Sequence, residues 1–150
     1  MEVRGKRTGI ILIITSLWAF ITISGWIGNW FIGLISSVIL MFLYMVLGAS
    51  KNGKLSKQLF LYPLLSWAVL WSAGFGFSKY YAEVFAGKMP DFTILGFHPS
   101  FAFTILTYWI GGVLTLTLGF YFFADHWLSD DDWNNFKKKI ESINSAKEEC

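Results

Sequence analysis

The polar residues that could do chemistry gather late in the sequence, where Asp125, His126 and the run Asp130 to Asp132 follow a long apolar stretch. Carboxylates and an imidazole together can bind a divalent metal, and at a membrane surface they could serve an interfacial enzyme. The same run is also typical of a helix start. Ser129 with Asp132 approximates a capping box, and acidic side chains favour the positive end of the helix dipole. We therefore expect a helix cap, and we assign no catalytic residue, metal or cofactor.

Tryptophans form the second group of chemical interest. Four of them fall near the middles of apolar stretches: Trp18, Trp67, Trp71 and Trp109. A cavity lined by their rings would suit an organic or cationic solute. Shape filling among packed helices, or against a partner, is the commoner role of such residues and the one that we expect. His98, beside Pro99, has no acidic residue near it in sequence, so we expect a structural role for it.

Long apolar segments carry most of these residues. The four segments run over residues 8–26, 30–49, 59–77 and 101–123. None contains Asp, Glu, Lys, Arg or His. About 20 apolar residues cross the hydrocarbon core as a helix, and unbroken apolar runs do not suit a barrel. The sequence predicts an all-α integral membrane protein of four transmembrane helices, arranged as a bundle of two hairpins. Residues 1–124 would form this domain and residues 125–150 a cytoplasmic amphipathic tail.

Basic residues are sorted by side. Ten of the twelve Lys and Arg residues precede the first segment, separate the second from the third, or follow the fourth, whereas only Lys79 and Lys88 lie between the third and fourth. Loops retained in the cytoplasm are rich in Lys and Arg. We therefore expect both termini to be cytoplasmic in a multi-pass protein of the cell membrane. No small-x-small cleavage pattern follows Ile23, so we expect the first segment to be retained as a signal anchor.

The interior of the predicted membrane domain holds hydroxyl groups but no ionisable side chain. Ionisable residues within spans mark proton relays and ion paths, so a proton-coupled pump is a poor interpretation. No phosphate-binding loop, nucleophile elbow or zinc motif occurs, and we expect no enzyme and no nucleic-acid partner.

Small residues recur at spacings of three and four along the fourth segment. The set is Thr104, Thr107, Gly111, Thr115 and Gly119, to which the third segment adds Gly74 and Gly76. Small side chains let helix backbones approach closely in lipid. This face would pack on the other helices of the chain or form a seam with a partner, and we favour the first.

The predicted tail helix also has one apolar side. Its stripe is Trp133, Phe136, Ile140 and Ile143, again at spacings of three and four. The tail would lie on the inner leaflet, helped by Lys137 to Lys139, or dock on a partner. Both interpretations stay open.

Three connections have local signals. Gly28 and Asn29 form a short turn between the first two segments, and Pro63 is expected in the first turn of the third helix. That helix could continue past Ser78 and end near Gly87 in a left-handed cap. Residues 92–99 are apolar but broken by Gly and Pro, which favours an interfacial or re-entrant segment over a solvated loop.

Residues 67–136 resemble the small accessory subunits of prokaryotic sodium:solute symporters. The matching features are Trp71, Ser72, Gly74, Phe75 and Gly76, then Leu95, Gly96, Phe97 and Pro99, then an acidic tail from Asp125 and Leu128. The chain departs from that family by an extra hairpin at its start and by the lack of a polar, Gln-rich turn. The resemblance implies an accessory role beside a larger carrier.

The sequence therefore favours a non-catalytic accessory subunit of a larger membrane transporter or complex, with a large integral membrane protein and the lipid bilayer as partners. A small homo-oligomeric solute carrier or channel is the alternative, supported by the central tryptophans and hydroxyls. An interfacial membrane enzyme comes third, because it rests only on the Asp and His residues near position 126.

Overall fold

The computed structural model of the chain describes residues 4–51 and 53–148. Residues 1–3, Asn52 and residues 149–150, which the predicted membrane domain and tail include, lie outside this part. Within the described residues, four helices are long and apolar enough to cross a membrane. The first two are α1 (Arg7–Trp26), preceded by a 3₁₀ turn at Arg4–Lys6, and α2 (Trp30–Gly48).

The third and fourth helices are each built from several segments. Span 3 (Lys57–Val84) consists of α3 (Lys57–Leu59), a π-helical segment at Phe60–Leu65 and α4 (Ser66–Val84). Span 4 (Pro99–Phe122) consists of α5 (Pro99–Thr104), π-helical segments at Ile105–Ile110 and Val113–Thr117, and α6 (Leu118–Phe122). The prediction of four apolar helices is confirmed, and span 3 is longer than its apolar run.

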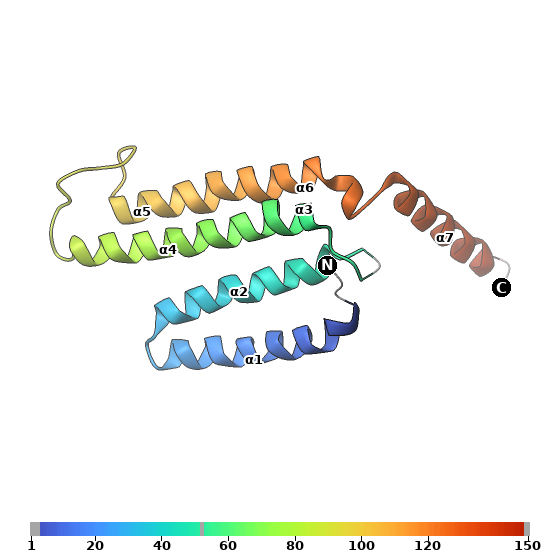
Figure 1. Ribbon diagram of the computed structural model, residues 1–150, viewed down its shortest axis with the longest axis horizontal. Helices are drawn as coiled ribbons and strands as arrows, with labels where there is room; N and C mark the ends of the chain where they lie inside the picture. Colours follow the sequence, from blue (N-terminus) through green and yellow to red (C-terminus); the bar gives the residue numbers. More distant parts are fainter. Residues whose placement is uncertain (1–3, 52, 149–150) are drawn as a thin grey trace.

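Packing between the four helices follows their order along the chain. α1 packs on α2, α2 on span 3, and span 3 on span 4 (Figure 1). In a compact four-helix bundle the first helix would also close on the fourth. Here the extensive contacts among the described residues join only consecutive helices, so α1 and span 4 form the two edges of a row.

Glycine makes the tight turn between the first two helices possible. Gly28 adopts φ +80°, a conformation that costs glycine little, and Asn29 N–H donates to Ser24 O at 2.9 Å. The turn reverses the chain within three residues and brings α2 back along α1 (Figure 1).

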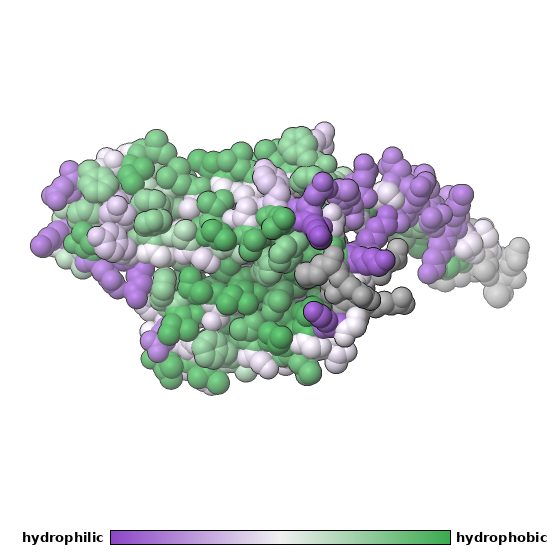
Figure 2. Space-filling view, viewed as in Figure 1, coloured by the Kyte–Doolittle hydropathy of each residue, from purple (hydrophilic) through white to green (hydrophobic). Residues whose placement is uncertain are grey.

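The hydrophobic core lies at the end of the row where the loop between α2 and span 3 runs. Its buried members are Val46, Ala49, Leu55, Leu59 and Leu64. Side chains from α1 and from span 4, including Ile10 and Phe120, pack against it. Elsewhere many large apolar side chains are exposed, and hydrophobic residues cover the helices in Figure 2 while hydrophilic ones gather at the ends and over α7. Such a surface suits hydrocarbon rather than water.

The expectation that Pro63 lies in the first turn of its helix is wrong. Ser56 is extended and the helix begins at Lys57, so Pro63 falls in the second turn, inside the π-helical segment. A π-helical turn bonds each N–H to the carbonyl five residues earlier, and this local widening accommodates a residue that has no N–H to donate. Pro63 is fully buried there.

The connection between spans 3 and 4 stays at its own end of the row (Figure 1). α4 ends at Val84 and Gly87 takes φ +69°, as the sequence predicts. Leu95 and Gly96 then form a tight turn with positive φ, closed by two backbone hydrogen bonds between Ile94 and Phe97.

Beyond span 4 a 3₁₀ turn at Ala124–His126 leads to α7 (Asp130–Glu148). α7 points away from the row (Figure 1). It makes no extensive packing contact with the described parts of the four long helices.

Candidate functional site

The small residues of span 4 lie along its seam with span 3. A Cβ placed on Gly74 would lie 2.8 Å from Thr107 Cβ, closer than real Cβ contacts. Thr107 Oγ1 donates to Phe103 O at 2.8 Å, which keeps the hydroxyl of this residue satisfied within its own helix. At this point the two backbones approach closely only because position 74 has no side chain.

Further along the seam, glycine again allows close contact. A Cβ on Gly119 would lie 2.7 Å from Pro63 Cβ, and one on Gly111 would lie 3.4 Å from Leu70 Cδ1. Thr115 is buried and donates to Gly111 O at 2.7 Å. These contacts run over about three turns of span 4, from Thr107 to Gly119, and Pro63 packs directly on Gly119.

At the end of the same seam that lies near the loop between spans 3 and 4, the contacts are polar. Ser78 Oγ lies 2.9 Å from Ser100 O, to which it donates, and 3.5 Å from Thr104 Oγ1. Gly76 does not belong to the seam, because nothing lies within 4 Å of a Cβ built on it. It lines an open apolar hollow with Ala73, Phe77 and Tyr80 instead.

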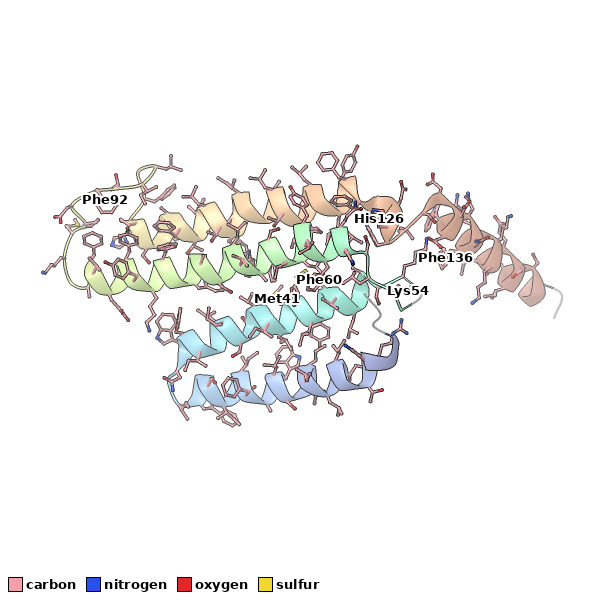
Figure 3. All side chains as sticks on the ribbon, in the orientation of Figure 1. Met41, Lys54, Phe60, Phe92, His126 and Phe136 are labelled. Carbon is pink, nitrogen blue, oxygen red and sulfur yellow. The ribbon has the colours of Figure 1, made fainter. Side chains whose placement is uncertain are left out.

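An aromatic groove of about 430 Å³ lies across span 3, between α2 and span 4. It is lined by Met41, Trp67, Trp71, Tyr108, Trp109, Gly112, Val113, Leu116 and Thr117. Met41 of α2 also lines the groove, and its side chain lies between α2 and span 3 in Figure 3. Three of the four predicted cavity tryptophans therefore meet at one place. Trp18 does not: it lies on α1, exposed, with Nε1 donating to Tyr44 Oη at 3.2 Å.

Three rings of the groove, those of Trp67, Trp71 and Tyr108, pack in series. Trp71 lies 4.3 Å from the Tyr108 ring centroid, nearly parallel to it, and 4.7 Å from that of Trp67. Trp67 is almost fully buried, whereas Trp109 is 69% exposed and forms the open wall. Tyr108 and Met41 are members that the sequence does not identify. The membership of Tyr108 follows from the seam, since the two helices are antiparallel and the Gly74–Thr107 contact places the residues after Thr107 opposite those before Gly74. Met41 belongs to the groove because α2 packs on span 3.

The indole N–H of Trp71 is buried and has no acceptor among the described residues. Trp71 lies six residues before Phe77, where the apolar run of span 3 ends, which is about 9 Å along the helix at about 1.5 Å per residue. Inside the hydrocarbon core of a bilayer, water does not satisfy such a donor. An unsatisfied buried donor costs about 1–3 kcal/mol.

The acidic cluster near the end of span 4 is divided among separate structural partners. His126 Nε2 lies 2.6 Å from Gln58 Oε1, and its ring stacks on Phe123 at 5.8 Å between centroids. Asp132 forms an ion pair with Lys51. Across the described ranges, no three His, Cys, Asp or Glu side chains come together as a group that could hold a metal ion.

Ser129 and Asp132 form the predicted capping box at the start of α7. Ser129 N–H donates to Asp132 Oδ2 at 2.9 Å and Ser129 Oγ to the same oxygen at 2.7 Å, while Asp132 N–H points back to Ser129 Oγ at 3.4 Å. Lys51 Nζ also donates to Ser129 Oγ at 3.1 Å. The Lys51 ammonium, followed by the Ser129 hydroxyl and N–H, lowers the pKa of Asp132 to about 2. The loop after α2 thus holds the start of the tail, a connection that spans 78 positions of sequence.

The apolar stripe of α7 is uncovered. Its four residues, Trp133, Phe136, Ile140 and Ile143, are between 41% and 52% exposed. Trp133 and Phe136 stack at 5.6 Å, and Lys137 Nζ lies 5.5 Å from the Trp133 ring centroid. Figure 3 places Lys54 and His126 at one end of the row and Phe136 beyond them on α7.

His98 has the structural role that the sequence suggests. Its Nδ1 accepts from Ser100 N–H at 3.2 Å and so caps α5, and its ring packs edge-on against Phe85.

Comparison with protein-family models, curated proteins and solved structures gives no match to this chain. The resemblance of residues 67–136 to symporter accessory subunits therefore stays a prediction.

Proposed function

We propose that this chain is a multi-pass membrane protein with both termini in the cytoplasm, and that it is a non-catalytic accessory subunit beside a larger integral membrane protein, of which a transporter is the class that we favour. Charge supports the topology. Lys6 and Arg7 at the start of α1 lie at the same end of the row as Lys51 and Lys54, and α7 leaves from that end (Figure 1). Lys79 and Lys88 lie toward the other end.

The observation that carries the accessory role is the row itself. A solute path needs helices that surround it, as in carriers whose repeats face one another across a central site. In the described part of the chain the helices pack mainly on their neighbours in sequence, so the row has two open faces and does not enclose a path. One copy of this chain therefore offers surface for assembly rather than a pathway.

The aromatic groove is the part of that surface best suited to a partner helix. Trp109 and Val113 present exposed apolar area, and Gly112 between them adds no side chain, so another helix backbone could approach. The Trp71 N–H is enclosed within the chain and is not part of this exposed surface. A transmembrane helix with small residues of its own would fit against Trp109, Gly112 and Val113. We propose such a helix of the larger subunit as the occupant.

The interfacial enzyme has no comparable support. His126 is held by Gln58 and Phe123, and Asp132 by Lys51 and Ser129, which are structural roles.

The test is extraction of the tagged full-length chain from its native membrane in mild detergent, followed by mass spectrometry of the proteins that co-purify. We expect a larger membrane protein in stoichiometric amount. The larger protein should no longer co-purify with the Trp109→Ala variant. It should still co-purify with Trp18→Ala, the matched control, which removes an exposed indole on the opposite edge of the row. A clean homo-oligomer without a larger protein would contradict the accessory role and favour the homo-oligomeric carrier, with flux in liposomes as the next measurement.

A further inference from the structure

The second open surface of the molecule is the stripe on α7, and its charges indicate what covers it. At about 100° per residue, the four apolar residues fall within an arc of about 80°. Lys137 and Lys139 lie on opposite sides of this arc, each about 40° beyond its edge, by the same rotation. Asp130 lies about 60° beyond the edge that carries Lys137, and Asp131, Lys138 and Glu141 lie farther round the helix, by the same rotation.

This distribution is that of a helix lying in a membrane interface. The apolar side sinks to the boundary of headgroups and acyl chains, and lysines at its edges extend along the surface to reach phosphates. Asp132 also lies near the stripe, but its charge is paired with Lys51. The acidic residues of α7 gather mainly in its first turn, whereas the lysines flank the stripe in the middle of the helix, where they complement anionic headgroups.

The position of α7 in the chain supports the same occupant. Only residues 123–129 separate the end of span 4 from the start of α7. Within this linker Trp127 and Leu128 are 38% and 46% exposed, so the apolar surface continues from span 4 to the stripe. The Lys51–Asp132 pair holds the first turn of α7 at the end of the row. A leaflet surface is thus within reach of α7 in every inserted molecule, without a second protein.

We propose that α7 lies along the cytoplasmic leaflet, with Trp133, Phe136, Ile140 and Ile143 at the headgroup boundary and with Lys137 and Lys139 against the phosphates of anionic lipids. This inference rests on the proposed membrane insertion but not on the accessory role. In Figure 1 α7 points away from the row, so this placement requires a change of direction within residues 123–129.

The experiment uses the full chain with Cys150→Ser, reconstituted in nanodiscs of phosphatidylcholine alone or with added phosphatidylglycerol. Spin labels are placed one at a time at Ile140→Cys on the stripe, at Asn134→Cys on the opposite side of α7, and at Val69→Cys on span 3, where the side chain is exposed. Collision with oxygen reports contact with lipid, and collision with a water-soluble nickel chelate reports contact with water.

We expect the Ile140 label to collide more with oxygen than with the nickel chelate in discs with anionic lipid, and to show a smaller difference in phosphatidylcholine alone. The Asn134 label should collide more with the nickel chelate in both kinds of disc. Lys137→Gln with Lys139→Gln should remove the dependence on anionic lipid. An Ile140 label as open to nickel as the Asn134 label would overturn the proposal, and so would one shielded from both reagents in either lipid, which indicates a protein contact. A Val69 label open to nickel would instead refute membrane insertion.

Discussion

Gly74 of span 3 and Thr107 of span 4 are in contact at a point where no larger residue than glycine fits, because a Cβ on Gly74 would lie 2.8 Å from Thr107 Cβ. This contact fixes how the two helices are aligned along their length. It brings Tyr108 onto Trp71 and so creates the aromatic groove.

Gly74→Ala should therefore destabilise the chain. Forcing a methyl group into a packed contact costs about 1–3 kcal/mol, and the lower midpoint should be visible in thermal unfolding of the purified chain in detergent. Gly76→Ala is the matched control two residues away, where a Cβ meets open space, and it should change the midpoint little. Equal effects of the two substitutions would contradict the seam.

Trp71→Phe separates stability from assembly. It removes an N–H that has no acceptor among the described residues, which should stabilise the isolated chain by about 1–3 kcal/mol. The smaller ring loses some packing and offsets part of this gain, so the free energy of unfolding should stay the same or rise. Recovery of the co-purifying partner should stay the same, because the N–H is enclosed within the chain and a partner helix does not reach it. A destabilised variant that also loses its partner would contradict this separation.

The link between Lys51 and Asp132 should depend on pH and salt. The pKa of Asp132 is lowered from 3.8 to about 2, so the link contributes fully above about pH 4 and is lost as the pH falls through 2. A spin label at Asn134→Cys should have the same mobility at pH 7 and pH 5 and become more mobile below pH 4. Because the pair is exposed, high salt should also loosen it.

Lys51→Ala should give that mobile spectrum already at pH 7, and Lys54→Ala, in the same loop but without a contact to Ser129 or Asp132, should not. A rigid label in Lys51→Ala would mean that other contacts hold the tail.

Topology is open to direct measurement by cysteine labelling in a Cys150→Ser background. With both termini inside, a membrane-impermeant maleimide should modify Lys88→Cys in intact cells and Lys54→Cys only after permeabilisation. The opposite labelling pattern would show that the chain has the inverted orientation, with α7 on the other side of the membrane.

The helices are the part of the fold that the sequence predicts well, and the reason is physical. Unbroken apolar runs have no alternative to a helix in lipid, so the ends of α1 and α2 fall within a residue of the predicted ones. Span 3 extends to Val84 because Ser78 to Val84 are compatible with a helix although they are more polar. The capping box at Ser129 is also local and was therefore predictable.

Relationships between distant residues were not predictable. Trp18 lies at a depth similar to that of Trp71, yet it faces Tyr44, because depth along a helix says nothing about its rotation. The Lys51–Asp132 pair joins a loop to a tail 81 positions later in the numbering, and no periodic pattern connects them. Likewise, hydropathy gives the number of helices but not whether they form a bundle or a row.

The row has a consequence for biogenesis. Since each helix packs mainly on the one made just before it, native contacts form between segments that are close in sequence, which is the condition for fast folding. During synthesis α1 and α2 are complete, with their Gly28 turn, before span 3 emerges, and span 3 can dock on α2 before span 4 exists. Each new helix thus meets its native neighbour already in place, and the chain can assemble in the order in which the ribosome makes it.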